Sequence, residues 1–208
     1  MDAFVLFFGV VAFITIGGLL FVIVHTPPKS TTSEKKIEGT DFIPSQMFMG
    51  NDGLGGIAVN ERTHQICLFT SPTTTPRILP ITDLLGSSII KNGEVLGDGQ
   101  RTHPQELVVF MKEHDPQKKS LIKSLHMGSS NNSNQRIDLF VVTHDQEEPI
   151  LVVNFLDMET KEGGILFEKA MSTATHWHYV LDGLILQADQ LARVQSEMTQ
   201  QDKTEVAP

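Results

Sequence analysis

A histidine and three carboxylates lie together in a predicted turn, where they could carry out acid–base chemistry. His144 and Asp145 follow an apolar run directly, and Glu147 and Glu148 belong to the same turn. An imidazole beside a carboxylate can take up a proton and return it to a leaving group. Turn residues of this kind more often only face solvent. A hydrolase that uses His144 with Asp145 or Glu147 is therefore the alternative hypothesis.

The triplet His176-Trp177-His178 suggests a metal site, because imidazole is a common zinc ligand. The surrounding sequence, however, predicts a helix, and residues two apart on a helix point about 200° away from each other. The two imidazoles then cannot reach one ion. We expect Trp177 on the buried face of the helix, with His176 and His178 at the edges of its apolar stripe. No metal and no other cofactor is expected.

Two further residue types that often carry chemistry have structural explanations. Cys67 is the only cysteine, which excludes an intrachain disulfide and a cysteine-based zinc site. We expect its thiol to be a small buried apolar group. The glycines at 50, 53, 55 and 56 match neither a P-loop nor a dinucleotide-binding fingerprint. Freedom of the backbone in a hairpin accounts for them.

The charge of the chain argues against one class of partner. The protein has 208 residues and a formal net charge of −9. Affinity for nucleic acid comes mainly from Lys and Arg side chains that neutralise phosphates. We therefore expect no nucleic-acid partner.

The first element that the sequence predicts is an apolar segment near the N-terminus. Residues 3–24 contain no charged side chain, and about 20 apolar residues are enough to cross a bilayer as a helix. We predict a single-pass transmembrane anchor over residues 1–25, in contact with the lipid bilayer through residues 3–24. It lacks the charged start and the cleavage site of a secretory signal. Because Lys29, Lys35 and Lys36 follow it, the N-terminus should face out and the C-terminal domain the cytoplasm.

The rest of the chain divides into a tether, one domain and a tail. Residues 26–40 are polar and include two prolines, as in a flexible tether. Residues 41–195 have the length of a single domain, and residues 196–208 are polar enough for a disordered tail. Apolar runs between turn signals predict antiparallel strands at 45–50, 56–59, 65–70, 77–79, 87–91, 94–96, 137–143 and 150–155.

A long amphipathic helix should follow the strands. Between Phe167 and Leu191, apolar residues recur at steps of three and four, which gives one apolar face that can pack on a sheet. Residues 97–135 are harder to interpret. Pro104 could start a helix there, but the run from Val108 to Phe110 also suits a strand.

The order of these elements resembles that of pleckstrin-homology-like (PH-like) and GRAM-like domains. Four runs also resemble a group of bacterial proteins with a PH-like domain, often beside a membrane helix: GIAVNERTHQICLF, RILPITDLLGSSIIKNGE, RIDLFVVTHDQEEPILVVNFLD and HWHYVLDGLILQAD. The resemblance implies an α+β fold, a PH-like antiparallel β-barrel or sandwich capped by a long C-terminal helix. It also implies a recognition module at the bacterial inner membrane. The short turn Asn51-Asp52-Gly53 lacks the basic loop of lipid-binding PH domains, so phosphoinositide binding is not expected.

An apolar cluster after the tether is the candidate contact with a partner. Phe42 precedes Met47, Phe48 and Met49, and methionine-rich surfaces adapt to partners. Burial in the first strand is the other interpretation. The leading hypothesis is a membrane-anchored, non-enzymatic interaction or scaffold protein whose domain binds a protein partner or a second copy. A sensor with a small ligand between sheet and helix is a further possibility.

Overall fold

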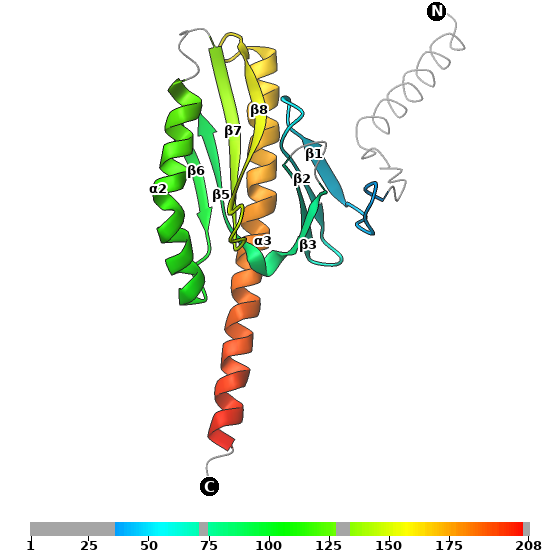
Figure 1. Ribbon diagram of the computed structural model, residues 1–208, viewed down its shortest axis with the longest axis vertical. Helices are drawn as coiled ribbons and strands as arrows, with labels where there is room; N and C mark the ends of the chain where they lie inside the picture. Colours follow the sequence, from blue (N-terminus) through cyan, green and yellow to red (C-terminus); the bar gives the residue numbers. More distant parts are fainter. Residues whose placement is uncertain (1–35, 71–74, 128–133, 206–208) are drawn as a thin grey trace, which may run out of the picture. The chain divides into compact units, whose positions relative to one another are not determined.

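The computed structural model describes residues 36–70, 75–127 and 134–205, and Figure 1 shows how their elements are arranged. The predicted anchor, its orientation and most of the predicted tether lie outside these residues. None of the helices in the described ranges is both long and apolar enough to cross a membrane.

The predicted fold, a transmembrane helix joined to a PH-like barrel or sandwich with one capping helix, is wrong. The described ranges instead contain two four-stranded antiparallel sheets and two helices, and neither helix could span a bilayer. The sheets are separate because β1 and β8, the outer strands that face each other, do not pair as neighbouring strands. The additional helix comes from residues that fitted a helix and a strand equally well.

The first sheet is formed by the four N-terminal strands in sequential order. Its two faces differ, because side chains alternate along a strand. Ile57 and Leu68 face the main core, whereas Ala58 and Cys67 face a smaller cluster on the other side. The strands are β1 (Gln46–Met49), β2 (Gly56–Asn60), β3 (Gln65–Phe69) and β4 (Arg77–Pro80).

The second sheet follows a single turn of 3-10 helix, η1 (Ile81–Asp83). Its order is β6-β5-β7-β8, and every neighbouring pair is antiparallel. Asn92 and Gly93 close the β5–β6 hairpin with positive φ angles of 50° and 85°, as a two-residue hairpin turn requires. The strands are β5 (Leu84–Lys91), β6 (Glu94–Gln100), β7 (Asn134–Thr143) and β8 (Ile150–Glu159).

The two helices cover opposite faces of the second sheet (Figure 1). Helix α3 (Ile165–Glu205) packs on the face that also carries the main core, which it shares with the first sheet. Trp177 is buried there, which confirms the prediction from the helical periodicity. Helix α2 (Gln105–Met127) contacts the other face through a small cluster that includes Leu85 and Met111. The main core of the domain therefore lies between the first sheet, the second sheet and α3.

Candidate functional site

The histidine of the predicted acid–base turn stands apart from its carboxylates. The side chain of His144 is exposed and meets the ring of Phe110 edge-on, with 4.8 Å between the ring centroids. Among the described contacts, none joins its imidazole to Asp145 or Glu147. A general base needs a partner that orients it. The structure does not bring these three residues together as such a unit.

Asp145 serves the turn instead. Its carboxylate accepts the backbone N–H groups of Glu147 and Glu148 and pairs with Arg77 at 2.5 Å. Burial alone would raise the pKa of Asp145, but these hydrogen bonds and the Arg77 charge outweigh it and lower that pKa. Asp145 is thus held as an anion that fixes the β7–β8 turn.

The two histidines beside Trp177 diverge, as predicted. His176 lies in solvent and contacts Gln46, with 2.8 Å between Nε2 and Oε1. His178 is half-buried beside the apolar stripe, as expected for a position at its edge. Its Nδ1 is 2.7 Å from Oγ of Ser87, because Gly97 has no side chain to keep the imidazole away from the sheet.

The Ser87–His178 pair joins β5 to α3 and has a structural role. Ser87 is completely buried, so its hydroxyl cannot reach a substrate. Burial lowers the pKa of His178, although Asp182 and Asp98 oppose that shift. Within the part of the chain that the structure describes, no group of three or more His, Cys, Asp or Glu side chains could hold a metal ion.

A serine–lysine pair, which the sequence does not reveal, lies under α2. Nζ of Lys118 is 2.7 Å from Oγ of Ser88 and 3.1 Å from Oδ1 of Asp98. Burial would raise the pKa of Asp98, but hydrogen bonds from Ser88 and Lys118 lower it, so a carboxylate anion lies beside Nζ of Lys118. These contacts join α2 to the second sheet.

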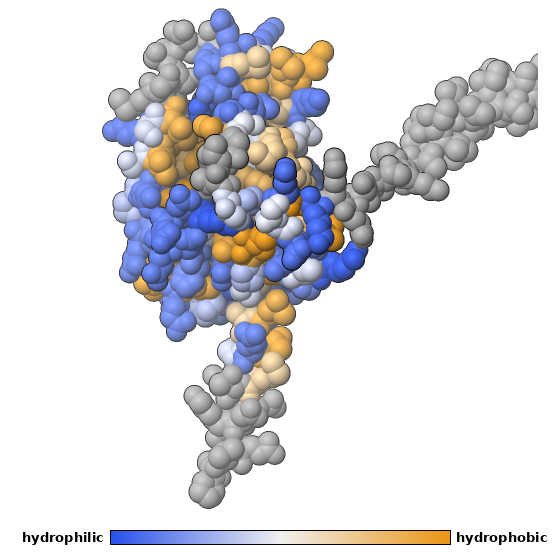
Figure 2. Space-filling model, turned by 45° about the vertical axis from the view of Figure 1, so that its right-hand side comes forward, coloured by the Kyte–Doolittle hydropathy of each residue, from blue (hydrophilic) through white to orange (hydrophobic). Residues whose placement is uncertain are grey.

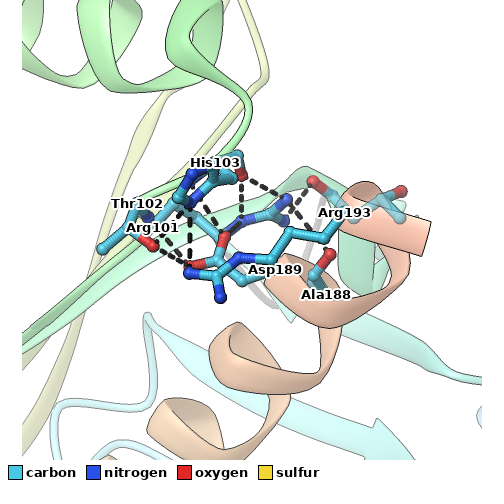
Figure 3. A network of polar contacts seen from close by, with 7 residues as sticks. Arg101, Thr102, His103, Ala188, Asp189 and Arg193 are labelled. Carbon is cyan, nitrogen blue, oxygen red and sulfur yellow. Dashed lines mark hydrogen bonds and ion pairs between the residues drawn. The ribbon is translucent and has the colours of Figure 1, made fainter. Parts of the chain in front are cut away.

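A buried ion pair joins the chain before α2 to α3 (Figure 3). The side chains of Arg101 and Asp189 are 1% and 8% exposed, and Nε donates to Oδ1 at 2.5 Å. Asp189 also accepts hydrogen bonds from Thr102 and from the backbone of His103. The remaining donors of the guanidinium bind the backbone carbonyls of Thr82, His103 and Ala188. With so many partners inside the protein, this network is a clamp between elements.

The four residues predicted to contact a partner do not form one patch. Phe42 is buried, and Met49 packs against the same cluster on the outer face of the first sheet. Met47 is half exposed. Phe48 points the opposite way, since side chains alternate along β1, and its ring stacks on Phe155 with 4.1 Å between centroids. Of these four residues, Phe48 alone lines an apolar groove between β1 and β8.

The best candidate site is an apolar groove between the outer strands of the two sheets, named here the β1–β8 groove. Its open volume is about 240 Å³. One wall comes from β1 and the turn after it, the other from the end of β8, and the first turns of α3 form its floor. The lining residues are Phe48, Asn51, Phe155, Leu156, Met158, Leu166, Lys169, Ala170 and Thr173.

A β-bulge shapes the wall that β8 contributes. The pairing of β7 with β8 shifts register between Ile137 and Asp138, so one residue of β8 is left over at this point. A bulge of this kind re-aims the side chains that follow it. Leu156 and Met158 consequently face the groove together with Phe155, instead of alternating away from it. A regular strand would have placed Leu156 on the other face.

Large apolar side chains around the groove remain in contact with solvent. Ile165 is 88% exposed, Leu166 55% and Met158 45%. They lie at the upper end of the domain, where β8 ends and α3 begins, and Figure 2 shows hydrophobic surface at that end. Exposed apolar groups gathered beside a groove mark a contact surface.

A larger hollow of about 400 Å³ lies beside α2 and β8, and two of its charged lining residues, Arg136 and Glu148, are held in ion pairs. Arg136 pairs with Asp138 and Asp157. Glu148 pairs with Arg77. The β1–β8 groove has the more apolar lining, so it is the better candidate for binding another protein.

Comparisons with protein-family models, curated proteins and solved structures found no match for this chain. The resemblance to bacterial PH-like proteins therefore stays a prediction.

Proposed function

We propose that this domain is a protein-recognition module that binds an apolar segment of a partner protein in the β1–β8 groove. The observation that carries the proposal is the groove itself, whose lining is mainly apolar and leaves Met158 and Leu166 exposed to solvent. Removal of such apolar surface from water is the main favourable contribution to most protein association. A partner that covers the groove would remove this apolar surface from water, which favours binding.

The construction of the groove supports recognition. The rings of Phe48 and Phe155 are stacked, and Trp177 lies against Phe48 with 6.5 Å between centroids. Rigid aromatic side chains in a wall lose little entropy when a partner binds, so they make good anchors. The groove is thus preformed, and a partner segment would not have to order it.

The polar clusters of the domain support binding over catalysis. Asp145, Asp98 and Asp189 each hold a charged partner or backbone N–H groups. The serines that lie near a possible base, Ser87 and Ser88, are completely buried. A hydrolase needs a nucleophile or a water-activating base that substrate can reach. The polar side chains of these clusters stabilise the fold instead.

Photo-crosslinking tests this function. A photo-reactive phenylalanine derivative replaces Met158 in the full-length chain, in the cells that make the protein. In a matched control it replaces Val109, which is exposed to a similar degree but lies on α2. We expect one defined adduct from position 158, joined to an apolar segment of the captured protein, and none from position 109. Equal adducts from both positions, or none from either, would contradict the proposal.

A further inference from the structure

The outer edge of β8 is open beside the groove. β8 is the last strand of its sheet, and the turn after β1 covers only part of its edge. The backbone N–H of Asn51 donates to the carbonyl of Asn154 at 2.8 Å, and the Asn51 side chain donates to the carbonyl of Phe155. The described contacts place no other strand along the edge after Phe155.

The pairing of β7 shows which backbone groups of that edge face outward. The N–H of Arg136 donates to Oδ1 of Asn92 at 2.8 Å, and its carbonyl accepts the N–H of Asn92 at 2.9 Å. Both groups of Arg136 therefore point away from β8. Arg136 lies opposite Asp157. Because opposite residues of an antiparallel pair either bond to each other or both point away, the N–H and carbonyl of Asp157 face outward.

A strand added at this edge would lie over the groove. Added strands run about 4.8 Å from their neighbour and point every second side chain to the same face. Met158 and Leu156 mark the groove side of β8, whereas the side chain of Asp157 is bound to Arg136 on the other side. Alternate side chains of the added strand would then enter the groove.

Lys169 specifies the charge of the occupant. It is the charged residue in the groove lining, and among the described side chains it has no ion-pair partner. An acidic side chain of the occupant would complement it, whereas a basic one would meet like charge. The occupant should therefore carry a carboxylate next to its apolar residues.

We infer that the groove takes an extended, apolar segment with one acidic side chain, which pairs as an extra strand with the outer edge of β8. This inference rests on the proposed function and specifies how the partner binds. Strand addition to an open edge takes its affinity from backbone hydrogen bonds and its specificity from pockets for alternate side chains. The edge at Asp157 would supply the backbone hydrogen bonds, and the β1–β8 groove would supply the pockets for alternate side chains.

The test uses a synthetic peptide, acetyl-TVTFTET-amide, with the full-length chain. Its valine, phenylalanine and glutamate share one face of a strand. Two control peptides carry N-methyl groups on alternate residues, one on the threonines and the other on the remaining residues. Only one of these sets can point its N–H groups at β8 in a paired strand. The peptide that is methylated on that set should bind about tenfold or more weakly than the parent, measured by fluorescence anisotropy. The peptide that is methylated on the other set should keep the affinity of the parent.

Two further readouts distinguish strand pairing from side-chain docking. Hydrogen exchange at the amide of Asp157 should slow when the peptide binds. Lys169→Glu should weaken the parent peptide and favour a variant with lysine in place of glutamate, by about tenfold in the ratio of affinities. Unchanged exchange at Asp157, or equal effects of the two methylated sets, would overturn strand pairing.

The outcomes separate this inference from the proposed function. If both methylated peptides bind as the parent does but Met158→Glu abolishes binding, strand pairing is overturned while recognition in the groove stands. If Met158→Glu leaves the affinity for every peptide unchanged, both are overturned. If the parent peptide does not bind at all, the inferred occupant is wrong, and crosslinking at position 158 decides the proposed function.

Discussion

The ring of Phe48 lies parallel to that of Phe155, with planes 4° apart and centroids 4.1 Å apart. This contact joins β1, the outer strand of one sheet, to β8, the outer strand of the other. The indole of Trp177 lies against Phe48, which brings α3 into the same aromatic cluster. The three elements that form the groove thus depend on one another.

Phe48→Ala should lower the free energy of unfolding by about 2–4 kcal/mol, because it removes a stacked ring that is partly buried. Phe48→Leu fills much of the space and should cost less. Met47→Ala is the matched control, since Met47 precedes Phe48 but is half exposed. Urea denaturation followed by the fluorescence of Trp177, the only tryptophan, measures all three. Equal costs for Phe48→Ala and Met47→Ala would contradict the stacked arrangement.

Arg101→Ala should destabilise the chain by about 3–5 kcal/mol, because it leaves the buried Asp189 carboxylate without its cation. The matched control is Lys36→Ala, which breaks an exposed pair with Asp41. Exposed pairs contribute little. A control variant that unfolds as early in urea as Arg101→Ala would show that Arg101 and Asp189 are not a buried clamp.

The Arg101–Asp189 ion pair should also make the free energy of unfolding depend on pH in the acid range. Burial would raise the pKa of Asp189, but hydrogen bonds from Thr102, Arg101 and His103 lower it below the ordinary 3.8. The unfolded chain then takes up the proton first, so this stabilisation is complete above about pH 5 and is lost as the pH falls through the lowered pKa. In Asp189→Asn the contribution is missing. The difference in unfolding free energy between wild type and Asp189→Asn should therefore shrink between pH 5 and about pH 2.

His178 should make the domain less stable in mild acid. Its pKa lies below the ordinary 6.5 because burial disfavours the imidazolium. Between that lowered pKa and about 6.5 the unfolded chain binds more protons than the folded one, so stability falls as the pH falls through this range. His178→Gln can keep a hydrogen bond to Ser87 without a titrating group. Its urea midpoint should change less between pH 7 and pH 5 than that of the wild type. An identical change in both would contradict the half-buried position of His178.

Cys67 should resist thiol reagents in the folded protein. It is buried, and burial raises its pKa to about 11, so almost no reactive thiolate is present at neutral pH. Labelling with a chromogenic disulfide reagent should be slow in buffer and fast in urea above the unfolding midpoint. Rapid stoichiometric labelling without urea would show that β3 opens in the native state.

Local signals in the sequence predict much of the sheet structure. Asn92-Gly93 closes a hairpin as predicted, because few residue pairs accept positive φ at both positions. The step of three and four along α3 predicts the burial of Trp177, because the periodicity of a helix alone determines its apolar face.

Helix α2 is where local signals are insufficient. Val108, Val109 and Phe110 favour a strand, and Pro116 lies inside the helix. Long-range contacts decide the outcome, since Lys118 is bound to β5 and β6. Such contacts join residues far apart in the sequence, so no local pattern announces them.

The candidate site also depends on long-range geometry. The sequence marks Met47, Phe48 and Met49 as one apolar edge, yet their alternation on β1 sends only Phe48 to the groove. The bulge in β8 and the start of α3 supply Leu156, Met158 and Leu166. Nothing in the apolar run of β8 marks the bulge, so the sequence alone predicts neither the wall nor the groove.

The most direct test of recognition in the groove compares the affinity of the crosslinked partner segment for three full-length chains. These are the wild type, Met158→Glu in the groove, and Leu186→Glu at an exposed apolar position elsewhere on α3. We predict that Met158→Glu raises Kd about tenfold or more, with an unchanged free energy of unfolding, while Leu186→Glu leaves Kd unchanged. Equal Kd values for the wild type and Met158→Glu would contradict a partner site in the β1–β8 groove.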